Sequence, residues 1–232
     1  GPNWPATRQI EGRTVMRNKR EVTGIVFHQT GIEYSIPSRF IRQHGVQMAA
    51  ALRVRGYPAG GRPAPGDTLP EKLRKGPSGV AAQATFMLRG ITVYGRPFQA
   101  HCYHANRLNG TTIGWEMEGL YPGLIDTQTG LFETTAGSKR KWTSVTEHII
   151  EMARESAVRT VEDARMWGYP IEYVYAHRQA SKTRRSDPGE FIWREVVGHV
   201  VRTCKLKKRV ASTMGDGQPI PKSWDDDGVG RY

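Results

Sequence analysis

Two histidines and one aspartate occupy positions at which their side chains could together hold a metal ion. His28 lies at the C-terminal end of an apolar run at 22–29, His177 directly follows another at 171–176, and Asp187 stands in the segment Arg-Arg-Ser-Asp-Pro-Gly. Two imidazoles and one carboxylate form a common ligand set for catalytic zinc, with the fourth position left for water. Taken singly, each residue is more often a hydrogen-bonded histidine or a turn aspartate, so only the set as a whole indicates a metal site.

These side chains need a fold that brings distant strand ends together, and the pattern of apolar residues predicts one. Runs rich in β-branched and aromatic residues predict strands at 22–29, 84–88, 91–94, 113–117 and 171–176. Helical spacing of apolar residues predicts helices at 38–55, 144–167 and 191–204. This order favours an α/β fold with a central mixed β-sheet flanked by helices. Ligand sites in such sheets form beyond the carboxyl ends of strands, which is where His28 lies.

Composition divides the 232-residue chain into one domain and two flanking segments. The domain is expected over 22–204, with a Gly- and Pro-rich insertion at 56–79 that is typical of a surface loop. Residues 1–21 form an N-terminal extension whose opening Gly-Pro resembles a tag scar, so a removed leader stays an open question. Residues 205–232, first basic and then rich in Gly, Pro and Asp, predict a weakly structured tail.

The chain is strongly basic, with a formal net charge of +12 and a pI near 10.0. Such a charge attracts polyanions, including nucleic acid, anionic lipid and an anionic cell wall. The basic residues are spread along the chain without aromatic interleaving or a nucleic-acid-binding motif, so no nucleic-acid partner is expected. No apolar run is long enough to predict a membrane span. Cys102 and Cys204 lack the spacing of a thiolate metal site and are predicted to be reduced packing residues.

Three sequence blocks resemble the signature blocks of one enzyme family, in the family's order. They are Val-Phe-His-Gln-Thr-Gly at 26–31, Tyr-His-Ala-Asn-Arg-Leu-Asn-Gly-Thr-Thr-Ile-Gly-Trp-Glu-Met at 103–117, and the segment from Ala-His-Arg to Arg-Arg-Ser-Asp-Pro-Gly at 176–189. Together they resemble the type 2 N-acetylmuramoyl-L-alanine amidases, a family that includes peptidoglycan recognition proteins, phage amidase endolysins and AmpD-like recycling enzymes. The resemblance implies a zinc amidase fold with Zn²⁺ as cofactor, ligands at His28, His177 and Asp187, and peptidoglycan as the partner.

The resemblance also implies catalytic roles for two charged residues. Glu116 matches the family carboxylate that faces the metal, and it would serve as general base. Glu118, two residues further, is the alternative base because it shares a strand face with Glu116 if the strand continues. Arg185 occupies the position of a family lysine that stabilises the oxyanion, and a guanidinium keeps that positive charge. Lys182 or Arg184 could replace it.

The middle block implies residues that contact substrate. His104 matches a family histidine that is not a metal ligand and is expected to line the cleft, and Asn109 is expected to contact substrate beside it. Asn106 stands where the family often has glycine, which leaves the shape of this loop open.

The implied activity is hydrolysis of the amide between N-acetylmuramic acid and L-alanine. The basic charge favours adsorption to an anionic cell-wall polymer or lipopolysaccharide, which suits a phage-type lytic enzyme made in the cytoplasm and acting on the host cell wall. Two alternatives stay open: a non-catalytic peptidoglycan-binding domain, and a cytosolic amidase that recycles muropeptides. The filled ligand set favours an enzyme, since relatives that only bind commonly lack part of it.

Overall fold

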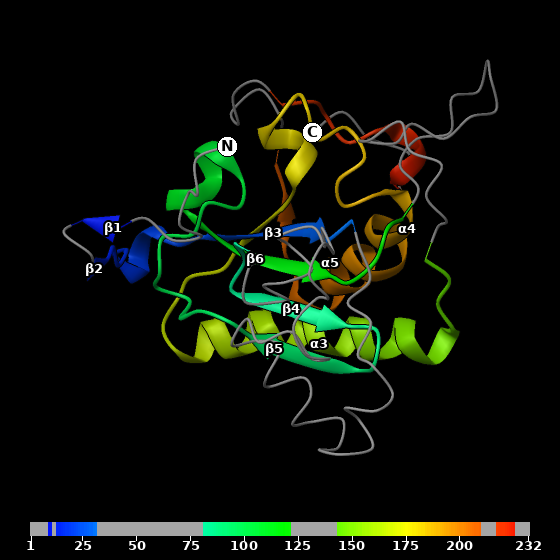
Figure 1. The fold of residues 1–232 in the computed structure, drawn as a ribbon, viewed down its shortest axis with the longest axis horizontal. Coiled ribbons are helices and arrows are strands. Elements are labelled where there is room, and N and C mark those ends of the chain that lie inside the picture. The colour runs from blue at the N-terminus through cyan, green and yellow to red at the C-terminus, as the bar shows by residue number, and fades with distance from the viewer. Residues whose placement is uncertain (1–8, 11–12, 32–80, 122–142, 210–216, 226–232) are drawn as a thin grey trace, which may run out of the picture.

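The structure, a computed structural model, describes residues 9–10, 13–31, 81–121, 143–209 and 217–225 (Figure 1). Its centre is a six-stranded sheet with the strand order β5-β4-β6-β3-β7-β8. The strands are β3 (Gly24–Gln29), β4 (Ala84–Met87), β5 (Ile91–Tyr94), β6 (Thr112–Met117), β7 (Tyr173–Ala176) and β8 (Lys207–Lys208). β4 and β5 form an antiparallel hairpin, and every other neighbouring pair is parallel. The predicted mixed sheet of an α/β fold is therefore confirmed.

The predicted strands differ from the observed ones by no more than a few residues at their ends. β3 is buried at every position because it lies in the middle of a parallel region that is covered on both faces. The β4–β5 hairpin turns at Gly90, whose φ of +76° is in the left-handed region that glycine adopts without a steric penalty. The turn predicted at Arg89-Gly90 is thus confirmed.

Two helical stretches occur where the apolar spacing predicts them. α3 (Glu147–Met166) begins after Thr146, whose hydroxyl accepts a hydrogen bond from the Ile149 N–H, and it ends before Gly168 with φ +86°. The second stretch is continuous through α4 (Glu190–Ile192), a π-helix (Trp193–Val197) and α5 (Gly198–Cys204). Figure 1 shows α3 running alongside β4 and β5. None of the described helices is long and apolar enough to cross a membrane. The predicted helix at 38–55 and the insertion at 56–79 lie outside the described residues.

The two faces of the sheet pack against different partners. Side chains alternate along a strand, so Ile25 and Phe27 face one way and Val26 and His28 the other. Ile25 and Phe27 belong to the main core cluster, which includes the buried positions of α3 and α5. Val26 packs instead with Ala105, Leu108, Tyr175 and Ala180 in a smaller cluster. This second face carries the candidate site described below.

The described residues after 204 pack against the domain. β8 adds the last strand at the β7 edge, and a short 3₁₀ helix, η7 (Lys222–Trp224), follows. Ile220 and Trp224 are fully buried in the main core, and Arg178 stacks on the Trp224 ring at 4.9 Å. Two large apolar side chains thus anchor the described residues of this polar segment to the core, while the domain bounds and the weakly structured tail stay predictions.

The two cysteines are both free and buried, as predicted. Burial raises the pKa of the Cys102 thiol to about 11 and raises that of Cys204. Cys102 Sγ accepts a hydrogen bond from Gln83 Nε2 at 3.2 Å. Both cysteines therefore serve as small packing residues in their neutral form.

Arg17 fastens the N-terminal segment to the domain. Its side chain is only 6% exposed, and its guanidinium donates to backbone carbonyls of Phe98, Gln99, Asn109 and Thr112. Burial lowers the pKa of Arg17 to about 10, which still leaves it cationic at neutral pH. The Arg17 side chain thus links the N-terminal segment to the loop at Phe98 and Gln99, to Asn109 and to Thr112, the first residue of β6.

Replacing Arg17 is expected to destabilise the fold. Arg17→Met removes the donor to the buried carbonyls of Asn109 and Thr112. Each buried unsatisfied group costs about 1–3 kcal/mol, so we expect a loss of about 2–6 kcal/mol in the free energy of unfolding. Urea denaturation followed by circular dichroism measures it. The control Arg159→Met removes an exposed arginine that pairs with Asp163 at 3.3 Å, and it should cost less than about 0.5 kcal/mol. Equal losses in both variants would contradict the anchoring role.

Candidate metal centre

The predicted ligands meet where two adjacent parallel strands end. β3 and β7 are paired with Phe27 opposite Ala176, so His28 and His177 follow at the same level of the sheet. His177 opens the 3₁₀ helix η4 (His177–Ala180), directly after β7. Asp187 lies in the segment before α4 and is tied to η4 by a hydrogen bond from the Arg178 N–H to the Asp187 carbonyl at 2.9 Å. Three residues from distant parts of the chain are thereby brought together.

Their ligand atoms converge on one point. His28 Nδ1 lies 3.0 Å from His177 Nδ1, and His177 Nδ1 lies 3.0 Å from Asp187 Oδ2. His28 Nδ1 and Asp187 Oδ1 are 3.9 Å apart. The three side chains are buried, and their ligand atoms all lie within 4.8 Å of one another. Bonds of about 2.0–2.1 Å in a tetrahedral zinc shell place ligand atoms about 3.4 Å apart, so the set fits one ion after small adjustments.

Hydrogen bonds around the ligands hold them in the orientation that a metal requires. His28 Nε2 lies 3.1 Å from His104 Nδ1, and His104 Nε2 lies 3.3 Å from the Thr112 carbonyl. If each Nε2 carries the proton, His28 donates to His104 and His104 donates to Thr112, which leaves the His28 Nδ1 lone pair facing the other ligands. Asp187 Oδ1 accepts from the Gln29 N–H at 3.1 Å, which orients the carboxylate.

His104 is built into the protein rather than exposed in a cleft. Burial, followed by the charges of Arg17 and His177, lowers the pKa of His104 to about 3, so it is neutral and its Nδ1 can accept a hydrogen bond from His28 Nε2. Gly114 lies beneath it, and a Cβ there would lie 3.0 Å from His104 Nδ1. A side chain at position 114 would therefore displace the histidine. Its position makes His104 a positioning residue for the ligand His28.

The loop around His104 is held by its two asparagines. Asn109 Oδ1 accepts from the N–H groups of His104 and Ala105, at 2.9 and 2.6 Å. Asn106 has a φ of +49°, a left-handed conformation that asparagine tolerates better than most residues, and its side chain donates to the Ala180 carbonyl at 2.9 Å. Asn106 thus supplies the backbone geometry for which glycine is the usual residue. Substrate contact by His104 or Asn109 stays a prediction.

A substitution at His104 tests its positioning role. His104→Phe keeps an aromatic ring but removes the acceptor for His28 Nε2, and loss of such an outer contact typically weakens metal affinity about 10- to 100-fold. Competition with a chromophoric chelator measures zinc affinity without any assay of activity. His148→Phe, on an exposed position of α3, is the matched control and should bind zinc as the unaltered chain does. Unchanged zinc affinity in His104→Phe would contradict a positioning role for the hydrogen bond between His28 and His104.

Glu116 lies beside His28 on the neighbouring strand. The parallel register pairs His28 with Glu116, about 4.8 Å away between strands, and paired residues point to the same face. Burial lowers the pKa of Arg96, and the Glu116 carboxylate acts in the opposite direction, so an arginine lies within electrostatic reach of Glu116. Glu118 has a different task, since its Oε2 accepts from the Leu88 N–H at 2.8 Å in a buried position. The geometry favours Glu116 over Glu118 as the base.

The candidate oxyanion residues lie at the surface of the segment that carries Asp187. Lys182, Arg184 and Arg185 all have exposed side chains. The Arg185 carbonyl accepts a hydrogen bond from Arg178, which fixes the backbone two residues before Asp187. An exposed cation at this place can approach a bound substrate, and its role stays a prediction.

Comparison with known proteins gives matches in structure only. No family model and no curated protein matches the chain. Among solved structures, it is similar to the endolysin N-acetylmuramoyl-L-alanine amidase LysCS of Clostridium intestinale, with 17% identity, TM-score 0.43, and coverage of 84% of this chain and 90% of that one. The amidase LysC of the same organism has 16% identity and TM-score 0.44, with coverage of 84% and 92%. Drosophila PGRP-LB has 13% identity and TM-score 0.41, with coverage of 76% and 79%.

Proposed function

We propose that this chain is a zinc-dependent N-acetylmuramoyl-L-alanine amidase, which hydrolyses the amide between N-acetylmuramic acid and L-alanine in peptidoglycan. The observation that carries the proposal is the buried set of His28, His177 and Asp187, with Glu116 in register beside it. A metal-dependent hydrolase uses a metal ion held by such a ligand set together with a nearby carboxylate that acts as general base. The identification of peptidoglycan as the substrate rests on the three sequence blocks that resemble the type 2 amidases.

The protein groups divide the reaction between them. Zn²⁺, when held by the three ligands, supplies Lewis-acid polarisation of the amide carbonyl and lowers the pKa of water. Glu116 takes a proton from the attacking water and delivers it to the nitrogen as the C–N bond breaks. Arg185 donates to the carbonyl oxygen while that oxygen is negatively charged. The products are a lactyl carboxylate on the sugar strand and a peptide with a free L-alanine amine.

The net charge suggests where this activity is used. At +12, the protein is attracted to anionic cell-wall polymers or lipopolysaccharide, and a lytic enzyme benefits from adsorption to its insoluble substrate. We therefore place the activity in a phage-type endolysin that is made in the cytoplasm and acts on the host cell wall. A recycling enzyme acting on small soluble muropeptides gains nothing from such adsorption.

The proposal is tested with purified peptidoglycan. The protein is incubated with it before and after chelation, and again after zinc is restored, and the soluble products are identified by mass spectrometry. Peptides that begin with a free L-alanine amine, lost on chelation and recovered with zinc, are the expected result. Intact wall that nevertheless retains the protein would overturn the enzymatic proposal and favour a binding domain.

A further inference from the structure

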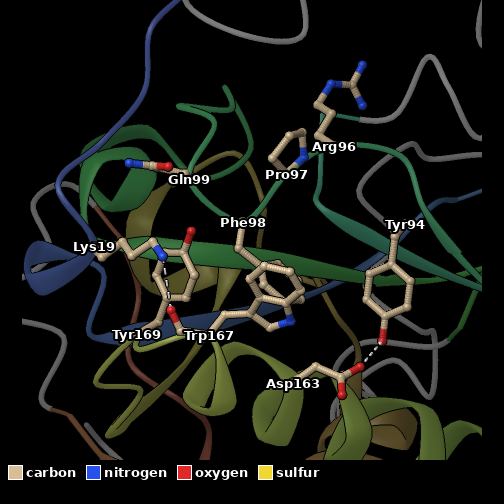
Figure 2. Close-up of a pocket in the computed structure, with 9 residues that line it drawn as sticks. All are labelled: Lys19, Tyr94, Arg96, Pro97, Phe98, Gln99, Asp163, Trp167 and Tyr169. Carbon is tan, nitrogen blue, oxygen red and sulfur yellow. Dashed lines mark hydrogen bonds between the residues drawn. The ribbon is translucent and has the colours of Figure 1, made fainter.

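Four aromatic side chains help to line a pocket that is separate from the metal centre. Its volume is about 440 Å³, within the range of about 300–1,000 Å³ typical of ligand sites. Figure 2 shows the rings of Phe98, Trp167 and Tyr169 close together, with Tyr94 across from them. They come from three parts of the chain: the end of β5, the loop after it and the segment after α3.

The pocket lies on the other side of the sheet from the metal ligands. Phe98 and Tyr169 pack with the main core, on the face that α3 covers, whereas His28 and Glu116 point from the opposite face. The pocket opens beside Tyr94, the last residue of the edge strand β5. A ligand here would therefore not compete with the substrate amide at the metal centre.

Phe98 contacts two of the other rings, while Tyr94 and Trp167 are open to solvent. Phe98 makes edge contacts with Tyr94 and with Tyr169, at ring distances of 5.8 and 5.9 Å. The Tyr94 hydroxyl donates to Asp163 at 3.4 Å. Nevertheless Tyr94 is 44% exposed and Trp167 is 64% exposed. Large aromatic side chains that are exposed beside a pocket are typical of a surface that binds a partner.

Polar groups at the rim decide the class of ligand. Lys19 Nζ donates to the Trp167 carbonyl at 3.2 Å, and Asp163 stands at the opposite side beneath Tyr94 (Figure 2). Gln99 adds an amide, while the Arg96 side chain points away from the rings. A cation and a carboxylate at one rim disfavour a charged ligand. An ammonium has three donors and a carboxylate about four acceptor sites, so Lys19 and Asp163 can each bond a polar ligand edge beside the contacts they already make. A neutral ring with apolar C–H faces and polar edges matches both the walls and the rim.

We propose that this pocket binds a sugar of the peptidoglycan glycan strand, an N-acetylated amino sugar stacked on Trp167. The identity of the sugar rests on the proposed function, whereas the pocket's preference for a neutral saccharide rests on its own walls and rim. A second contact on the same polymer raises the effective concentration of the substrate amide at the metal centre. The pocket thus holds the enzyme on the wall between successive cleavages.

The test measures saccharide binding without hydrolysis. The N-acetylglucosamine tetramer, which has no muramyl amide, is titrated into ¹⁵N-labelled protein, and the indole N–H signal missing in Trp167→Ala assigns Trp167. We expect this signal to shift, and binding to weaken about tenfold or more in Trp167→Ala, with partial rescue in Trp167→Tyr. Met166→Ala, at a 76% exposed neighbour that does not line the pocket, should bind as the unaltered chain does.

The outcomes separate this proposal from the proposed function. Since the Trp167 side chain is mostly exposed, both of its variants should unfold at the same temperature as the unaltered chain. No shift of the Trp167 signal, or equal binding by Trp167→Ala, overturns the pocket proposal whether or not the wall is hydrolysed. Tetramer binding at Trp167 without any wall hydrolysis overturns the proposed function and leaves the saccharide pocket standing. If the protein both binds the tetramer at Trp167 and hydrolyses the wall, Trp167→Ala should release less peptide from the wall but should cleave a short soluble muropeptide at the normal rate.

Discussion

Glu116→Gln is expected to lose nearly all hydrolysis while it still binds zinc. Glutamine has the same shape as glutamate but cannot take a proton from water, and general-base catalysis contributes about 10²- to 10⁴-fold to a rate. The three metal ligands are untouched, so zinc affinity by chelator competition should be unchanged. Release of peptides from purified peptidoglycan measures the rate.

The control for this prediction is the neighbouring carboxylate. Glu118→Gln keeps an oxygen that can accept from the Leu88 N–H, the contact that Glu118 makes at 2.8 Å, and its rate should stay close to that of the unaltered chain. If Glu118→Gln were inactive and Glu116→Gln active, the general base would be Glu118. If both were active, the carboxylate mechanism would have to be abandoned.

His177→Ala is expected to lose both zinc binding and hydrolysis. In structural zinc sites with four protein ligands, an apparent binding energy of about 10–16 kcal/mol corresponds to about 3 kcal/mol for each ligand, so loss of His177 should lower zinc affinity by at least about 100-fold. Its nitrogen is central to the set, 3.0 Å from both His28 Nδ1 and Asp187 Oδ2. Chelator competition measures the affinity, and peptide release measures the activity.

Thermal unfolding adds a readout that does not depend on catalysis. A metal that binds only the folded state raises the unfolding temperature, so zinc should stabilise the unaltered chain and Glu116→Gln alike. His177→Ala should gain no stability from zinc at the same concentration. Stabilisation by zinc that persists in His177→Ala would show that the ion binds elsewhere, and the assignment of His177 as a zinc ligand would be wrong.

Much of the fold follows from local patterns in the sequence. The apolar residues of α3 recur at helical spacing, and Thr146 and Gly168 mark its ends, so a short window of sequence predicts the helix. The runs that became β3 and β6 are recognised by their β-branched and aromatic residues. The types of the ligand residues could likewise be predicted, because zinc accepts few kinds of side chain. These properties depend on neighbours along the chain.

The tertiary structure decided everything that depends on distant neighbours. His28 and His177 are 149 residues apart, and only the parallel pairing of β3 with β7 shows that their Nδ1 atoms face each other. Sequence reasoning assigned His104 to substrate and missed its hydrogen bond to His28, for which the only signal was its place in the middle block. It left Glu118 open as a base, although a contact 30 residues away, with Leu88, occupies that carboxylate.

The tail shows the same division between local and distant information. Its polar composition predicts little structure, yet Trp224 is buried against the main core and stacked with Arg178. Composition averages over a segment, whereas burial depends on whether a particular apolar side chain finds a complementary surface elsewhere in the fold. The sequence by itself therefore determined which elements form and which residues could bind zinc. The tertiary structure determined which atoms meet, because those contacts join segments that no local pattern connects.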